Sequence, residues 1–274
     1  MILDRIAKST RIRVDNIKQQ LSMEELKERV FGCNEAIHNR NAFAFERAIK
    51  KNNSLMTDIN SLSFICEIKK ASPSKGVIAE EFPYRTIAKE YVEAGADAIS
   101  VLTEPEYFLG KDRYLSEISR EVPIPVLRKD FIIDEYQIYE AKLIGADAVL
   151  LICSLLDTLQ IHRYLGICDE LGLSALVEAH TEMEILSAIR AGARVIGVNN
   201  RNLNTFEVDI NHSIRLRKSV PEDIIFVAES GIRNARDIEV LRDAKVDAVL
   251  IGETLMRSNN KKEELARLQG HLLQ

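Results

Sequence analysis

Charged and aromatic residues occur two positions apart at the ends of short apolar runs. Glu67 and Lys69 end one such run, and Lys129 and Phe131 end another. Residues two apart in a strand share a face, so the members of each pair are expected to point the same way. A lysine can donate a proton and a carboxylate can accept one, so these residues are candidates for acid–base chemistry. For the Glu67–Lys69 pair taken alone, a salt bridge at the rim is the alternative.

Three more polar residues follow apolar runs in the same way. Glu178 comes directly after one run, and Asn199 and Arg201 share a face at the end of the next. Each could be a solvated strand end on its own, but their shared position predicts one common site. Crowding of Lys69, Lys129 and Arg201 is expected to lower the pKa of a lysine toward working pH, which suits a general acid.

The last two apolar runs end in a different chemistry. Ser230-Gly231 follows one of them, and Gly252-Glu253 follows the other. Glycine lets the backbone approach a ligand closely, and backbone N–H groups at such turns bind phosphate. Glycine also forms plain turns, but here both loops carry the right chemistry together. They predict a phosphorylated ligand, so cations must be concentrated locally in a protein whose net charge is −5.

A repeated pattern predicts the elements that position these residues. The chain repeats a helix end, a tight turn and a short apolar strand at 94–102, 144–152, 191–198 and 244–251. Gly95, Gly145 and Gly192 occupy the turns, where the residue after a helix commonly adopts a left-handed conformation. A further apolar run lies between each pair of repeats, so the underlying period is about 25 residues, or one strand plus one helix.

Eight apolar strands are expected on this basis. They lie at about 63–68, 97–102, 124–128, 147–152, 173–178, 194–199, 224–228 and 246–251. Apolar strands that alternate with helices indicate a parallel sheet covered on both faces. Eight such units predict an α/β fold, a single (β/α)8 TIM barrel whose active site lies at the carboxyl ends of the strands. An open doubly wound sheet is the alternative, although no G-x-G-x-x-G motif follows the first strand.

Residues 1–60 precede the first strand and read as an N-terminal helical extension of the barrel at 61–274, all within one domain, 1–274. Ser22 and Glu25 form a capping box that is expected to open a helix through Val30. The segment 34–50 has a less regular helical spacing, and the polar segment 51–60 links it to the barrel. We expect the extension to form a lid over one end of the barrel.

Composition and cysteine usage argue against several function classes. The pI near 5.7 gives no indication of nucleic-acid binding, and no apolar run is long enough for a membrane helix. No cluster of histidines and carboxylates has metal-ligand spacing, and no cofactor is expected. The four cysteines show no regular spacing, and the N-terminus lacks the apolar region of a signal peptide. A reduced, cytoplasmic protein is therefore predicted.

The segment from Glu67 to Gly76, EIKKASPSKG, resembles the signature of the indole-3-glycerol phosphate synthases. The resemblance continues at 101–110, 125–134, 196–203, 228–232 and 251–256 and spans most of the chain. It implies decarboxylating ring closure and dehydration of 1-(2-carboxyphenylamino)-1-deoxyribulose 5-phosphate, which yields indole-3-glycerol phosphate, carbon dioxide and water. The partner implied is this small phosphorylated substrate, with other enzymes of the tryptophan pathway as further candidates.

The resemblance also implies roles for individual residues. Lys129 would protonate the substrate carbonyl oxygen, and Glu178 would be the base of the dehydration. Glu67 and Lys69 would join the proton transfers, and Asn199 would hold the hydroxyls of the open sugar chain. The residues implied for substrate binding are Ser72, Phe108, Phe131, Arg201, Ser230, Gly231, Gly252 and Glu253. Of these, the two phenylalanines would pack the aromatic ring, and the last four residues would cradle the phosphate, Glu253 through its backbone.

Two other functions fit parts of this pattern. A barrel similar to phosphoribosylanthranilate isomerase would need a cysteine base on the first strand and an aspartate on the sixth. Cys66 does lie on the first strand, but the sixth ends in Asn199. A barrel that only binds a ligand or acts as a scaffold would be expected to have lost its catalytic positions, whereas both lysines and both glutamates are present.

Overall fold

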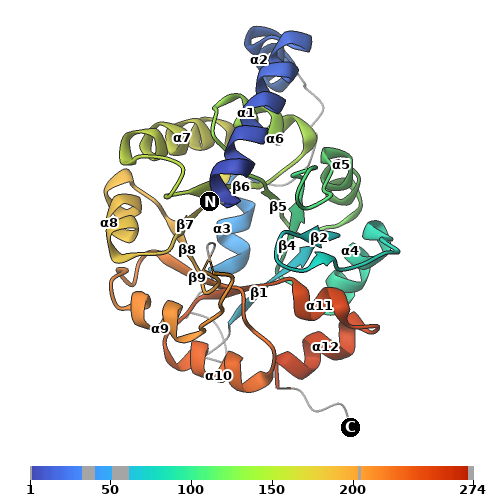
Figure 1. The fold of residues 1–274 in the computed structure, drawn as a ribbon, viewed down its shortest axis with the longest axis vertical. Helices are drawn as coiled ribbons and strands as arrows, with labels where there is room; N and C mark the ends of the chain where they lie inside the picture. The colour runs from blue at the N-terminus through green and yellow to red at the C-terminus, as the bar shows by residue number, and fades with distance from the viewer. Residues whose placement is uncertain (1, 33–40, 51–61, 203–204, 271–274) are drawn as a thin grey trace.

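A computed structural model describes residues 2–32, 41–50, 62–202 and 205–270 (Figure 1). Eight parallel strands close into a barrel, because β1 pairs with β4 on one side and with β10 on the other. The strands are β1 (Ser63–Ile68), β4 (Ala98–Leu102), β5 (Val126–Lys129), β6 (Ala148–Ile152), β7 (Ser174–Ala179), β8 (Val195–Asn199), β9 (Ile225–Glu229) and β10 (Ala248–Ile251). The closed strand order confirms the predicted barrel and excludes the open sheet.

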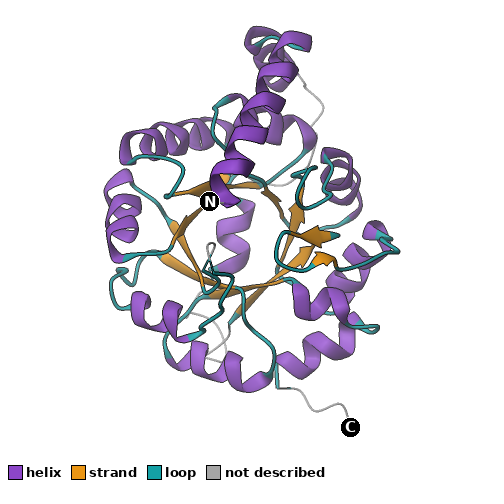
Figure 2. Ribbon diagram, in the orientation of Figure 1, coloured by secondary structure: helices purple, strands orange, loops and turns teal. Residues whose placement is uncertain are grey.

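A ring of helices surrounds the strands (Figure 2). These helices are α4 (Tyr84–Glu93), α5 (Asp112–Glu121), α6 (Tyr136–Ile144), α7 (Thr158–Leu171), α8 (Glu182–Ala191), α9 (Asn211–Arg217), α10 (Ala235–Asp243), α11 (Glu253–Arg257) and α12 (Lys261–Leu268). Gly95, Gly145 and Gly192 have φ values of 89°, 93° and 93°, which confirms their left-handed role after helices. Within the described ranges, no helix is both long and apolar enough to cross a membrane.

The alternation of the strands explains which residues reach the barrel interior. An apolar cluster inside the barrel includes Ile65, Leu127, Leu176 and Val227. On each of these strands the residue two positions further along is charged and shares the inner face, which gives Glu67, Lys129, Glu178 and Glu229. The sequence therefore changes from apolar to charged at the level where the barrel interior ends and its mouth begins.

Helices α1 (Ile2–Gln20) and α2 (Met23–Gly32) begin the chain, and α1 crosses the carboxyl end of the barrel (Figure 1). Ser22 and Glu25 make the predicted capping box: the Glu25 N–H donates to the Ser22 hydroxyl, and the Glu25 carboxylate accepts from the Ser22 N–H. Arg13 and Lys18 pair with Asp130 and Asp134 in the loop after β5. These ion pairs hold α1 over the barrel mouth.

Helix α3 (Ala44–Ile49) lies at the opposite end of the barrel, so the prediction that the whole extension covers one end was wrong. Phe45 and Ile49 are fully buried and pack in the inner apolar cluster, which includes strand starts such as Ala98 and Ala248. The barrel interior would otherwise open to water at this end, and α3 closes it. The predictions for 34–40 and for the linker 51–60 fall outside the described residues.

Candidate active site

A cavity of about 630 Å³ opens at the carboxyl ends of the strands. Every residue that the sequence predicts for the site lines this cavity: Glu67, Lys69, Ser72, Phe108, Lys129, Phe131, Glu178, Asn199, Arg201, Ser230, Gly231, Gly252 and Glu253. Ile2, Leu3 and Ile6 of α1 also line it. Helix α1 therefore forms part of the cavity wall, and the strand ends and the segments that follow them form the rest.

Lys129 lies among carboxylates at the floor of the cavity. Its Nζ is 3.4 Å from Oε2 of Glu229 and 3.8 Å from Oε2 of Glu178. Asn199 Nδ2 donates to the same oxygen of Glu178 at 3.5 Å. His180 Nε2 is 3.7 Å from the other oxygen of Glu178. The strand ends of β5, β7, β8 and β9 thus converge on one lysine.

The pKa of Lys129 shifts in the direction opposite to the sequence-based expectation. Burial acts to lower this pKa, but Glu229, Glu178 and Glu67 outweigh burial and raise the pKa above its ordinary value. The expectation of a lowered pKa considered only the neighbouring cations and omitted these carboxylates. Lys129 is therefore protonated at neutral pH, but its raised pKa makes it a weaker acid than the sequence analysis expected.

Glu229 is a residue that the sequence analysis missed. Its side chain is 1 % exposed, and neither carboxylate oxygen has a hydrogen-bond partner among the described residues. Burial raises the pKa of Glu229 to about 7, the repulsion of Glu178 adds to this rise, and Lys129 opposes it. A side chain on Gly197 would collide with the Glu229 carboxylate, so the glycine makes room for it. Strand alternation could have identified Glu229, because it lies two residues after Val227, which faces the barrel interior.

Glu67 and Lys69 form a hydrogen-bonded ion pair, as expected for residues on the same face of β1. Burial acts to raise the pKa of Glu67, but Lys69 and Lys129 outweigh burial and lower it. The carboxylate is therefore ionised at neutral pH. Gly252 lies so close to this pair that an added Cβ would overlap the Glu67 carboxylate and come within 3.0 Å of Lys69 Nζ.

One side of the cavity is aromatic and apolar. The rings of Phe108 and Phe131 have centroids 5.9 Å apart and planes tilted by 38°. Leu102, Leu150 and Ile152 extend this wall toward the inner cluster. A flat aromatic group bound here would bury apolar surface on several sides, which favours its binding.

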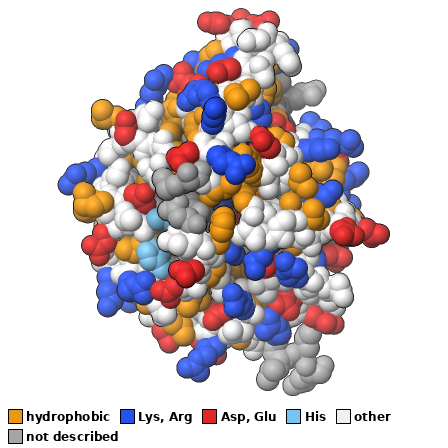
Figure 3. All heavy atoms as spheres, in the orientation of Figure 1, with side chains coloured by type: hydrophobic (Ala, Val, Ile, Leu, Met, Phe, Trp, Pro, Cys, Tyr) orange, Lys and Arg blue, Asp and Glu red, His pale blue; other side chains and the backbone are white. Residues whose placement is uncertain are grey.

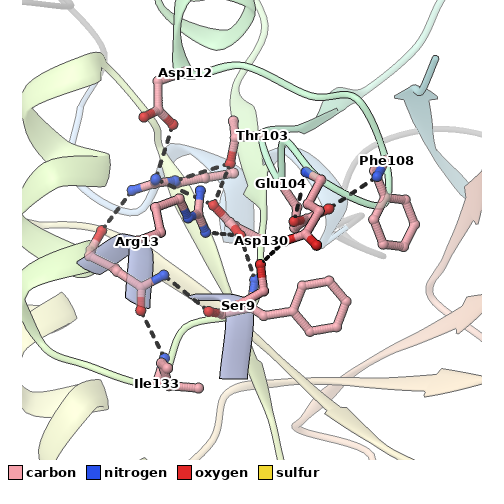
Figure 4. A network of polar contacts seen from close by, with 12 residues as sticks. Ser9, Arg13, Thr103, Glu104, Phe108, Asp112, Asp130 and Ile133 are labelled. Atoms are coloured by element: carbon pink, nitrogen blue, oxygen red, sulfur yellow. Dashed lines mark hydrogen bonds and ion pairs between the residues drawn. The ribbon is translucent and has the colours of Figure 1, made fainter. Parts of the chain in front are cut away.

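A buried polar network fixes the loops that carry these phenylalanines (Figure 4). Asp130 accepts from Arg13 at 2.8 Å, from Thr103 at 2.9 Å and from the Phe131 N–H at 2.8 Å. Glu104 accepts three backbone N–H groups of the loop 106–108, at 2.7 to 3.0 Å. Charge-assisted bonds of this kind are strong, so the loops are held in place before a ligand arrives.

Arg128 supports the same network from the outer face of β5. It is buried and pairs with Asp112 at 3.0 Å, Glu140 at 2.7 Å and Asp130 at 3.4 Å. Three carboxylates compensate one buried guanidinium, which explains how a charge is tolerated on the outer face of β5. Arg128 and Lys129 are neighbours in the chain, so the network also fixes the backbone from which Lys129 extends.

The opposite side of the cavity is polar and rich in cations. Ser230 and Gly231 both have a positive φ, 67° and 86°, and an added Cβ on Gly231 would collide with Val208. Asn200 donates to the Ser230 carbonyl at 3.1 Å and fixes this turn. Ser72 lies in β2 (Ala71–Ser72), which forms a small hairpin with β3 (Gly76–Val77) after β1.

Positive charge is concentrated at this polar side. Lys75, Arg201, Arg233 and Arg257 line the cavity near Ser230 and Gly252. On the face drawn in Figure 3, basic and acidic side chains are interspersed. Within the described residues, no group of three or more His, Cys, Asp or Glu side chains is arranged to hold a metal ion. The geometry suits acid–base chemistry on an anionic ligand with an aromatic part.

Sequence comparisons point to one family. Residues 3–268 match the family model described as indole-3-glycerol phosphate synthase. A protein of that name from Ruminiclostridium cellulolyticum is 61 % identical over 270 residues, which cover 98 % of this chain and 99 % of the relative. Another from Lachnoclostridium phytofermentans is 51 % identical over 280 residues, which cover 99 % of this chain and 100 % of the relative.

Solved structures support the fold alone. A 3-hexulose-6-phosphate synthase from Salmonella typhimurium superposes with a TM-score of 0.61 at 17 % identity, covering 77 % of this chain and 100 % of that one. A thiamine phosphate pyrophosphorylase from Pyrococcus furiosus gives a TM-score of 0.56 at 19 % identity, covering 77 % of this chain and 95 % of that one. Both are too distant in sequence to indicate an activity.

Proposed function

The chain belongs to the indole-3-glycerol phosphate synthase family, and from this premise we propose which of its residues perform the reaction. The enzyme is a lyase of tryptophan biosynthesis. It converts 1-(2-carboxyphenylamino)-1-deoxyribulose 5-phosphate to indole-3-glycerol phosphate, carbon dioxide and water. The observation that carries the assignment of residues is the position of Lys129, between two carboxylates and beside an aromatic wall.

The two sides of the cavity set the orientation of the substrate. The carboxyphenyl ring lies against Phe108 and Phe131, where it buries apolar surface. The phosphate lies at the other side, cradled by the turns at Ser230-Gly231 and Gly252-Glu253, with Ser72 nearby. Arg201 adds positive charge and orders this end. The open sugar chain spans the floor, where the Asn199 amide holds its hydroxyls.

Lys129 is the general acid of ring closure. It donates a proton to the substrate carbonyl oxygen as the ring carbon that carries the carboxylate bonds to the carbonyl carbon. Loss of carbon dioxide then restores the aromatic ring. The raised pKa keeps Lys129 protonated at neutral pH until the substrate accepts its proton. Glu229, 3.4 Å away, can return a proton to Lys129 because its own pKa is about 7.

Dehydration completes the indole. The hydroxyl formed from the carbonyl oxygen leaves as water with a proton from one of the two lysines, and Glu178 takes the proton that the adjacent ring carbon gives up. Glu67 and Lys69, joined by their hydrogen bond, take part in these proton transfers. Helix α1 reduces access of water to the cavity, because Ile2, Leu3 and Ile6 form part of the wall. Exclusion of water strengthens each of the electrostatic interactions at the floor.

The first test is turnover of the carboxyphenylamino-deoxyribulose phosphate, followed by indole fluorescence. The chain contains no tryptophan, so the product signal rises from a low background. Lys129→Met should lower kcat by at least about a hundredfold, which is the ordinary contribution of a general acid. Lys89→Met, a change of the same kind on the exposed side of α4, is the matched control. Near-normal turnover by Lys129→Met would remove this lysine from the mechanism.

We also propose that the enzyme is cytoplasmic. Association with other enzymes of the tryptophan pathway stays a prediction from the family resemblance. Cys66, Cys153 and Cys168 are free thiols, and Cys33 lies outside the described residues. Free thiols are typical of a reducing compartment. Fractionation of the native host's cells, with the enzyme's activity measured in each fraction, tests the location.

A further inference from the structure

A carboxylate lies among the cations at the phosphate side of the cavity. Oε2 of Glu253 is 3.5 Å from Nη2 of Arg201, and Oε1 is 3.2 Å from Nε of Arg257 and 3.7 Å from Nζ of Lys75. The three cations come from the loop after β8, from the end of α11 and from the hairpin after β1. One side chain therefore joins three segments that all line the cavity.

The Glu253 carboxylate presents the same chemistry as part of a phosphate. A phosphate monoester carries a charge of about −1.5 to −2 at pH 7 and has three acceptor oxygens, which suit Arg and Lys donors. Burial acts to raise the pKa of Glu253, but its hydrogen bond to Arg257 and the charges of Lys75 and Arg201 outweigh burial and lower it. Glu253 is therefore an anion at neutral pH and already occupies donors that a phosphate needs.

The carboxylate and a phosphate compete for these donors, because like charges at this separation repel. The Glu253 side chain is 30 % exposed, so it has room to turn toward solvent. Arg257 is four residues further along the same helix and can remain paired with Glu253 after such a turn. Arg201 and Lys75 belong to other segments and would be released.

We propose that the Glu253 side chain is a placeholder for the substrate phosphate. It pairs with Arg201 and Lys75 in the free enzyme and leaves both when the phosphate binds. This inference rests on the proposed function, because it requires the phosphate to bind at this side of the cavity. It adds a role for the side chain to the cradling role of the Glu253 backbone.

The placeholder has two consequences for the enzyme. It neutralises repulsion among the cations, so Arg201 and Lys75 stay in position without a ligand. It also opposes the binding of small anions, since each must first displace the carboxylate. A substrate offsets the cost of displacing the carboxylate through its additional contacts with Phe108 and Phe131. Inorganic phosphate contacts only the cations and the backbone turns. The displacement weakens the binding of both ligands by the same factor, so the contacts with the two phenylalanines decide which ligand still occupies the site.

The test is Glu253→Gln, which removes the charge and keeps the shape, with inorganic phosphate as the probe. The dissociation constant for phosphate, measured by calorimetry and as competitive inhibition, should fall about fivefold, and KM for the substrate should fall with it. Without phosphate the variant should melt at a lower temperature, since three cations lose their partner. Added phosphate should then raise its Tm by more than it raises the wild-type Tm.

Glu222→Gln is the matched control. It removes the same charge from an exposed pair with Lys245, whose atoms are 2.9 Å apart, and should leave phosphate binding, KM and turnover unchanged. If Glu253→Gln binds phosphate as the wild type does, or more weakly, the placeholder role is overturned while turnover by the wild type still supports the proposed function. A wild-type enzyme that neither turns over the substrate nor binds phosphate overturns the proposed function, and the placeholder with it.

Discussion

At the scale of single residues, Glu229 makes the enzyme sensitive to pH. Its pKa of about 7 lies above the ordinary value of 4.5, because burial disfavours the carboxylate. The folded state therefore holds a proton that the unfolded state releases. Stability from this source is fully present below about pH 4.5 and is lost as the pH rises through 7.

Glu229→Gln should remove this dependence. Urea unfolding at pH 5, 6, 7 and 8 should show the wild type losing free energy of unfolding relative to the glutamine variant as the pH rises. The step near pH 7 that ionisation of Glu229 gives to kcat should also disappear. Parallel stability curves for the two proteins across this range would mean that Glu229 has an ordinary pKa.

Substitution of Gly252 gives a second prediction at the scale of single residues. An alanine would place Cβ against the Glu67 carboxylate and 3.0 Å from Lys69 Nζ, so this ion pair must move. We expect kcat to fall on the order of tenfold to a hundredfold, because small displacements of catalytic groups are costly. Gly166→Ala in α7 is the control and should keep full activity, since no atom of the described part of the chain lies within 4 Å of the added Cβ. Equal activity of both variants would contradict the proposed role of the pair.

The residues of the site were predictable where strand alternation alone decides their direction. Glu67, Lys69, Lys129 and Glu178 lie in the cavity because each continues the inner face of its strand. Glu229 obeys the same rule but was missed, since its segment was interpreted only for the Ser230-Gly231 turn. The pKa of Lys129 was beyond prediction, because it depends on carboxylates of other strands that only barrel closure brings near.

At the scale of elements, the strands and the N-terminal helices were predictable, whereas the position of α3 was not. Repeats fixed the eight strands, and their bounds agree with the structure to within about two residues at each end. Helix α3 has only six residues, and nothing in its spacing indicates which end of the barrel it covers. Its position depends on the shape of the barrel interior, which forms only when segments far apart in the sequence come together.

The contact between α1 and the loop after β5 supplies the prediction at this scale. Arg13 pairs with Asp130, which is fully buried and is also bonded by Thr103, Arg128 and the Phe131 N–H. Arg13→Gln should lower the free energy of unfolding by about 2 kcal/mol, as expected for loss of a charged hydrogen bond. It should also speed hydrogen exchange in α1 and raise KM, because the cavity wall loosens.

Arg11→Gln is the control for this experiment. Arg11 also bonds the loop after β5, through Asp134 at 3.3 Å, but its side chain is half exposed, and such pairs contribute little. Faster exchange in α1 for Arg13→Gln alone would identify the buried contact as the one that holds the helix. Identical exchange in both variants and the wild type would show that α1 is held by its apolar contacts instead.

At the scale of the whole molecule, the two ends of the barrel have separate tasks. The carboxyl end holds the charged residues of the cavity, whereas α3 fills the amino end with apolar side chains. The inner apolar cluster separates α3 from the charged residues at the floor of the cavity. Stability and catalysis should therefore respond differently to changes at the two ends.

Phe45→Ala tests this separation, because Phe45 is fully buried at the amino end. Removing the ring should cost about 3–5 kcal/mol through lost burial and a cavity, which lowers Tm by roughly 10 °C in a chain of this size. Well below that transition, kcat/KM should stay near the wild-type value, since Lys129 and its carboxylates are held from the other end. Leu159→Ala, at an exposed position of α7, should change neither quantity. A fall in kcat/KM without loss of stability would mean that α3 directly positions Lys129 and its carboxylates.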